Sequence, residues 1–114
     1  MSLERVLKLF KSLGFSKVEA EVYVYLAKAG PTKPKDLMIG LGMTRQQLYP
    51  ALEKLKKKKI VDIRPESHAL FSTLTFEELL NHYVKMSLKQ AEAIKETKEV
   101  LLDCWQNMSK QNNA

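Results

Sequence analysis

The sequence has few features of secreted or membrane proteins. Its 114 residues include one cysteine, Cys104, which has no partner for a disulfide within the chain. No apolar run approaches the roughly 20 residues that span a bilayer, and the N-terminus lacks the apolar block of a signal peptide. We therefore expect a cytoplasmic protein with no membrane partner. Cys104 fits a structural role, and a redox-sensing thiol is the open alternative.

The motifs that mark most enzymes are also missing. The sequence contains no glycine-rich phosphate loop, no His, Cys and Asp cluster with metal-ligand spacing, and no nucleophile beside a base. It is 45% apolar and 28% charged, which is typical of a globular domain. We predict a protein that is not an enzyme and that holds neither a metal nor a cofactor.

Positive charge is concentrated in one segment. The net charge is +6, and residues 28–64 hold ten basic side chains against three acidic ones. Such a local excess is typical of a surface that binds a polyanion such as DNA. A solvated, lysine-rich helix end is an equally good interpretation of the charge alone.

Helical periodicity and turn residues predict a winged helix-turn-helix. All glycines and prolines lie in the first 65 residues, and capping boxes begin three helices, at Ser16 with Glu19, at Thr44 with Gln47 and at Thr75 with Glu78. The predicted elements are helices over 3–13, 16–29, 34–41 and 44–58, strands over 60–64 and 69–74, and a helix from 76 to about 108. In the second helix the side chains expected to face inward are Val18, Val22, Tyr25, Leu26 and Ala29. The fold class is mainly α with minor β: residues 1–75 form the domain with its β-hairpin wing, and residues 76–114 form a long C-terminal dimerisation helix.

The last predicted helix is too long to be covered by its own domain. At about 1.5 Å per residue it would extend roughly 50 Å. One stripe at alternating spacings of four and three residues is apolar except at Ser87 and Lys98. This pattern favours a coiled coil with a second copy of the chain. The predicted dimer interface is Leu80, Val84, Ala91, Ile94, Leu101 and Trp105. The alternative is that part of the stripe covers the domain core and the end frays.

Two segments resemble the TrmB-type transcriptional regulators. Residues 9–26, LFKSLGFSKVEAEVYVYL, are similar to the opening of that family, which has a leucine, Leu-Gly-Phe/Leu-Ser/Thr, Glu-Ala and Val-Tyr in this order. Residues 44–61, with Tyr49, Leu52 and Leu55, are similar to its recognition helix and first wing strand. The resemblance covers about residues 3–75. It implies a dimeric winged-helix regulator whose fourth helix enters the major groove of double-stranded DNA.

The chain departs from the TrmB pattern in three places, one of which is Pro50. Lys59 stands where the family usually has glycine, so we expect the turn after the recognition helix to be built differently. Typical members carry a C-terminal sugar-binding domain, whereas this sequence ends in SKQNNA. Sugar sensing is therefore not carried over, and no small-molecule effector is expected.

The predicted recognition helix has an apolar inner face and a polar outer face. With Leu48, Leu52 and Leu55 inward, its first turns carry the side chains suited to base edges, which are Arg45, Gln46, Gln47 and Tyr49. The lysines expected at phosphates are Lys33, Lys35, Lys54 and Lys57. Arg64 and His68 lie at the predicted wing tip, where they either enter the minor groove or are simply solvated. For Tyr49, packing beneath the wing is the alternative.

Pro50 interrupts the predicted helix. An interior proline removes one backbone hydrogen bond and costs about 3 kcal/mol or more. We therefore expect a kink or a loosened first turn over 46–50. The predicted function is a homodimeric, sequence-specific transcriptional regulator. The alternatives are a winged-helix protein-interaction module, to which an exposed Pro50 and Glu53 would contribute, and a nonspecific chromatin-like DNA binder.

Overall fold

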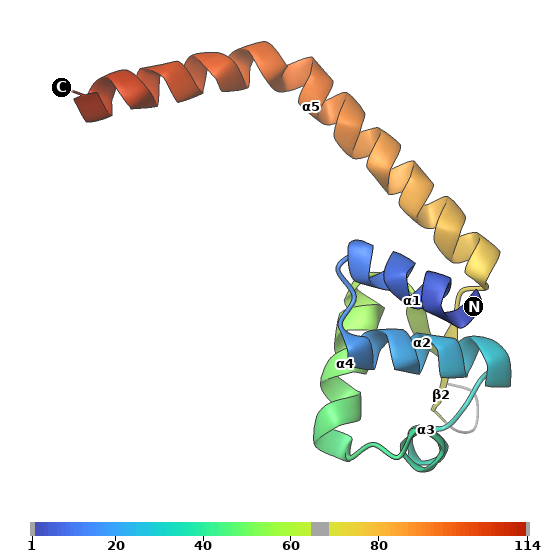
Figure 1. The fold of residues 1–114 in the computed structure, drawn as a ribbon. Helices are drawn as coiled ribbons and strands as arrows, with labels where there is room; N and C mark the ends of the chain where they lie inside the picture. The colour runs from blue at the N-terminus through green and yellow to red at the C-terminus, as the bar shows by residue number, and fades with distance from the viewer. Residues whose placement is uncertain (1, 65–68, 114) are drawn as a thin grey trace. The chain divides into compact units, whose positions relative to one another are not determined.

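The fold consists of four helices, a two-stranded hairpin and a long last helix (Figure 1). The computed structural model describes residues 2–64 and 69–113. Its elements are α1 (Ser2–Ser12), α2 (Lys17–Ala29), α3 (Pro34–Leu41), α4 (Arg45–Lys57), β1 (Val61–Arg64), β2 (Leu70–Thr73) and α5 (Phe76–Asn113). The chain divides into two compact units, Met1–Glu77 and Glu78–Ala114. The first unit has the helix order and the hairpin of a winged helix-turn-helix, as the sequence predicts.

The capping boxes predicted for α2 and α4 form. The Ser16 hydroxyl accepts a bond from the Glu19 N–H at 3.1 Å, and the Glu19 carboxylate accepts one from the Ser16 N–H at 3.2 Å. Thr44 and Gln47 repeat the arrangement at the start of α4, at 3.3 and 3.0 Å. Each box satisfies two backbone donors that a helix start leaves unpaired. The boundaries of α2 and α4 therefore follow from local chemistry.

Three helix ends share one turn geometry. Gly14 after α1, Gly42 after α3 and Lys59 after α4 have left-handed φ values of +87°, +64° and +63°. At the end of α4 the Lys59 N–H donates to Lys56 and the Ile60 N–H donates to Leu55, at 2.9 and 3.0 Å. This is the Schellman bonding pattern.

The different turn expected at Lys59 is therefore wrong. The lysine adopts the conformation that glycine adopts elsewhere in this chain. A left-handed conformation costs a residue with a Cβ atom about 1–2 kcal/mol. The two backbone bonds and the burial of Leu55 and Ile60 on either side of the turn offset that cost.

An aromatic cluster forms the centre of the first unit. Phe10 is fully buried, and its ring centroid lies 4.8 Å from that of Phe15, 5.2 Å from Tyr23 and 6.4 Å from Phe76. The Tyr23 hydroxyl donates to the Leu74 carbonyl at 2.9 Å, so the one polar atom of this buried ring has a partner. The cluster thus joins α1 and α2 to the chain that follows the hairpin.

The inner face of α2 is rotated from the expected one. Its buried apolar side chains are Ala20, Val22, Tyr23 and Leu26, whereas Val18 and Tyr25 are half-buried and Ala29 is exposed. Val22 and Leu26 were assigned correctly. The hydroxyl of Tyr23 has a backbone acceptor within the fold, so this tyrosine rather than Tyr25 is buried.

The hairpin is fastened to the helices by a third short strand segment. β1 and β2 pair antiparallel, with Val61 opposite Thr73 and Arg64 opposite Leu70. On the other side of β2, Thr32 exchanges two backbone bonds with Phe71 at 3.0 and 2.8 Å. The α2–α3 connection therefore pairs with β2 of the wing, a pairing that the sequence did not predict.

Candidate nucleic-acid interface

The helix α4 separates an apolar and a polar face, as predicted. Leu48, Leu52 and Leu55 are at most 2% exposed, and Ala51 joins them in the core. α4 packs against α2 through this side. The side chains on the other faces are exposed, and among them Gln47 also accepts the Thr44 N–H of the capping box: Arg45, Gln46, Gln47, Glu53, Lys54, Lys56 and Lys57.

Arg45 and Tyr49 stack against each other on the surface of α4. The guanidinium carbon lies over the tyrosine ring, 4.7 Å from its centroid. The two residues are one helical turn apart, so their side chains are neighbours on the same face. A guanidinium stacked in this way keeps its edge free for hydrogen bonds while its plane is held by the ring. Tyr49 is half-buried, which suits the role of a platform.

Pro50 does not loosen the start of α4. The helix is continuous from Arg45 to Lys57, and the capping box closes its first turn. The Leu48 N–H donates to the Thr44 carbonyl at 3.0 Å, as in a regular helix. The loosened first turn expected at 46–50 is therefore wrong, whereas the kink expected as its alternative stays a prediction. Pro50 is exposed, so its ring and the Gln46 carbonyl that loses a donor lie on the solvent side, where water can replace the missing bond.

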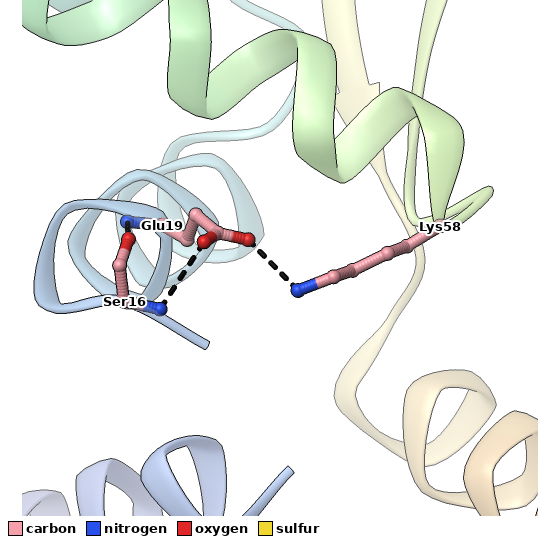
Figure 2. A network of polar contacts seen from close by, with 3 residues as sticks. All are labelled: Ser16, Glu19 and Lys58. Carbon is pink, nitrogen blue, oxygen red and sulfur yellow. Dashed lines mark hydrogen bonds and ion pairs between the residues drawn. The ribbon is translucent and has the colours of Figure 1, made fainter. Parts of the chain in front are cut away.

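A buried ion pair ties the end of α4 to the start of α2. The Lys58 ammonium lies 2.9 Å from Glu19 Oε2 and 4.3 Å from the centroid of the Phe15 ring. Figure 2 shows the Glu19 carboxylate between this ammonium and the Ser16 backbone. Only 4% of the Glu19 side chain and 32% of the Lys58 side chain are exposed. Lys58 is therefore held by the fold and is not free for phosphates.

The surroundings of Glu19 lower its pKa. Burial by itself would raise the pKa of this carboxyl, but the hydrogen bonds from Lys58 and from Ser16 outweigh it. The carboxylate form is thus the one the fold is built around. The sequence shows Glu19 only as a capping residue, and nothing local signals its second partner, because Lys58 lies 39 positions away.

The other predicted contact residues lie at separate places on the first unit. Lys33 and Lys35 are exposed at the start of α3, where Lys33 is the N-cap without a side-chain cap bond. Arg64 is exposed at the end of β1 and lines a small hollow of about 130 Å³ beside Gly30 and Thr75. His68 lies outside the described residues. Within residues 2–64 and 69–113, no group of three or more His, Cys, Asp or Glu side chains is placed to hold a metal ion.

The second unit exposes apolar side chains along its helix. Val84, Ile94, Leu101 and Trp105 are 59%, 61%, 54% and 66% exposed. A hollow of about 430 Å³ follows the face from Ile94 to Met108 and includes Cys104, which is exposed and free. The predicted interface residues Leu80 and Ala91 are exposed as well. None of the described helices is both long and apolar enough to cross a membrane.

Known proteins are similar to this chain in sequence or in fold. The chain is 27% identical over 92 residues to the HTH-type sugar sensing transcriptional regulator TrmBL1 of Pyrococcus furiosus. The aligned segment covers 81% of this chain and 27% of that relative. The chain thus spans about a quarter of that relative's length. The fold is similar to the transcriptional regulator Tm0710 from Thermotoga maritima, with a TM-score of 0.56, 16% identity, and coverage of 94% of this chain and 84% of that chain.

A second solved structure and a family model agree. The MarR-like transcriptional regulator tm0816 from Thermotoga maritima gives a TM-score of 0.52 at 15% identity, with 99% of this chain and 93% of that chain covered. At such identities the two structures show the fold alone. The family model described as sugar-specific transcriptional regulator TrmB matches residues 10–77, which include all of α2, α3, α4 and the described hairpin. The chain therefore belongs to the TrmB family of transcriptional regulators.

Proposed function

We propose that this chain is a homodimeric, sequence-specific DNA-binding regulator that places α4 in the major groove. The observation that carries the proposal is the start of α4, where Arg45, Gln46 and Gln47 are exposed around a closed first turn. The N-terminal residues of a recognition helix are the ones that meet base edges. In this role residues 1–75 bind DNA and residues 76–114 join two copies.

Each side chain of α4 has a distinct role in this proposal. Arg45 donates two bonds to a guanine, and Gln46 or Gln47 pairs with an adenine, each good pair contributing about 1–3 kcal/mol of discrimination. Tyr49 holds the Arg45 guanidinium in place from the side, instead of reading a base itself. This assignment replaces the direct contact that the sequence suggested for Tyr49.

Exposed lysines on two helices are proposed to contact phosphates. Lys54 and Lys57 are exposed on the later turns of α4, and Lys33 and Lys35 are exposed at the start of α3. Lysines at phosphates fix the position of a protein on DNA without reading sequence. Arg64 and His68 are proposed to act from the wing, Arg64 in the minor groove.

Selection of bound fragments from random duplex DNA tests the proposal. We expect an enriched motif containing guanine and adenine, and an affinity for it that falls steeply as salt is raised. Arg45→Ala should relax the sequence preference at one position. Absence of binding to every duplex at low salt would end the proposal, and binding without an enriched motif would favour the chromatin-like alternative.

A protein-interaction module is the second candidate. Its support is the exposed pair Pro50 and Glu53 on the same helix, since an acid beside phosphates is repelled. Reversing the charge of both Lys54 and Lys57 to Glu separates the two candidates. If α4 binds DNA, this variant loses affinity for all sequences. If α4 binds a protein surface that does not depend on these two charges, the variant still binds its protein partner.

A further inference from the structure

The exposed stripe of α5 is uneven along its length. Nine side chains from Leu80 to Met108 follow one another at alternating spacings of four and three residues. Between Leu80 and Ile94 the stripe positions are small: Val84, Ser87 and Ala91. From Ile94 onward they are larger: Ile94, Lys98, Leu101, Trp105 and Met108. A partner helix would therefore need large side chains opposite the first half of the stripe and small side chains opposite the second half.

A second copy supplies this complement only when it runs in the opposite direction. If the pair is centred between Ala91 and Ile94, Ala91 lies opposite the partner's Ile94 and Val84 lies opposite the partner's Leu101. Each small side chain then meets a larger one, which is how facing helices fill a shared core. The same register places Ser87 opposite the partner's Lys98, so the two polar positions of the stripe meet each other.

A parallel pair would place identical side chains face to face. Two Lys98 ammonium groups would be held together in the seam, where like charges are repelled and lose their hydration. Two Ala91 side chains would leave a void, and two Trp105 indoles would crowd the same layer. In the antiparallel register Lys98 faces Ser87, Ala91 faces Ile94 and Trp105 faces Leu80, so the repulsion between ammonium groups, the void and the paired indoles are absent.

We propose that α5 pairs with α5 of a second copy in antiparallel orientation, in the register that seats Ser87 against the partner's Lys98. This inference rests on the homodimer of the proposed function and adds its orientation and register. The side chains to be buried are those now in solvent, with Val84, Ile94, Leu101 and Trp105 all more than half exposed. The hollow from Ile94 to Met108 receives the partner's small half.

Disulfide trapping tests the orientation in the full chain. Val84→Cys and Leu101→Cys are each made in a Cys104→Ser background, which removes the natural thiol. In the proposed register a residue 84 and its own copy are about 25 Å apart along the pair, beyond the roughly 7 Å that a disulfide tolerates. Neither variant alone should form a covalent dimer on mild oxidation, whereas the two variants co-expressed should. Covalent dimers from either variant alone would overturn the proposal.

A charge placed at residue 87 tests the register independently. Ser87→Glu should face the partner's Lys98 twice in each dimer and tighten self-association about fivefold at low salt. Ser87→Gln is the matched neutral control and should lack this gain. A Glu variant that dimerises more weakly than the Gln variant would show that residue 87 meets its own copy, and would overturn the register.

Light scattering and DNA binding of the wild type separate this inference from the proposed function. A dimer that binds DNA but cross-links as a parallel pair removes the antiparallel register alone. An antiparallel dimer that binds no duplex removes the DNA-binding proposal alone. A monomer at micromolar concentration removes both the dimer and its register.

Discussion

The two units of this chain treat apolar surface in opposite ways. In Met1–Glu77, Phe10, Leu48 and Leu55 are fully buried by neighbours from the same unit. In Glu78–Ala114, side chains of the same kind, Leu101 and Trp105, remain more than half exposed. Helical periodicity alone is the same in both, so an apolar stripe does not say whether its partner is the same chain or another. Burial in the folded unit makes that distinction.

The largest expected effect compares one substitution in both units. Leu48→Ala should lower the free energy of unfolding by about 2–5 kcal/mol, because it opens a cavity in a closed core. Leu101→Ala should change it by less than about 0.5 kcal/mol at concentrations where the chain is monomeric, because the side chain is already in solvent. Urea unfolding followed by circular dichroism measures both. Equal losses would break the comparison between the units.

The ion pair of Glu19 tests whether the first unit depends on a charge in its interior. Glu19→Gln keeps an acceptor for the Ser16 N–H but removes the charge beside Lys58, and should cost about 1–2 kcal/mol at neutral pH. The half-exposed Lys58 limits the loss, since its ammonium can turn to water. Glu4→Gln, at an exposed position of α1, is the control and should have little effect.

The same pair predicts a dependence on pH. The pKa of Glu19 is lower in the folded protein than the ordinary value of 4.5. Its contribution is therefore complete above pH 4.5 and is lost as the pH falls through the folded pKa. The wild type should lose stability in this acid range faster than Glu19→Gln. Urea midpoints that fall in parallel for both proteins would contradict the assigned role of the carboxylate.

A smaller effect is expected on DNA binding if Tyr49 orients Arg45 within the first unit. If Tyr49 acts through Arg45, then Tyr49→Leu should weaken specific binding by about 0.5–1 kcal/mol, and should have no further effect once Arg45 is Ala. Tyr49→Phe keeps the ring and should bind like the wild type. An additional loss for Tyr49→Leu in the Arg45→Ala background would instead show a direct contact between Tyr49 and DNA. Fluorescence anisotropy on the selected motif measures these four variants.

The smallest expected effect concerns the left-handed turn at Lys59. Lys59→Gly should stabilise the first unit by about 0.5–1 kcal/mol, because glycine adopts this conformation without the Cβ penalty. The gain is smaller than that penalty, since glycine loses more conformational freedom on folding. Lys59→Ala retains the penalty and controls for the lost charge. Thermal unfolding of the two variants measures the difference. A glycine variant no more stable than the alanine variant would show that the turn is not strained.

Predictions from the sequence were accurate where a few neighbouring residues carry the physics. The capping boxes at Ser16 and Thr44 form because both partners lie within one turn. The inward face of Leu48, Leu52 and Leu55 follows from the helical repeat alone. Two predictions were wrong, the different turn at Lys59 and the loosened first turn over 46–50. Both rested on a local energetic cost, that of a left-handed lysine and that of an interior proline. The backbone bonds after Lys59 and the solvent beside Pro50 offset these costs.

What the sequence by itself determined is the set of elements, their order and the family, since these depend on short-range spacing. Only the tertiary structure decided which groups meet across the chain. The Glu19–Lys58 pair and the Thr32–Phe71 bridge join residues that are 39 positions apart in each case. Long-range pairs depend on how the elements pack, and no local pattern encodes them. Packing thus paired Lys58 with the buried carboxylate of Glu19, and it left the apolar side chains of the α5 stripe exposed.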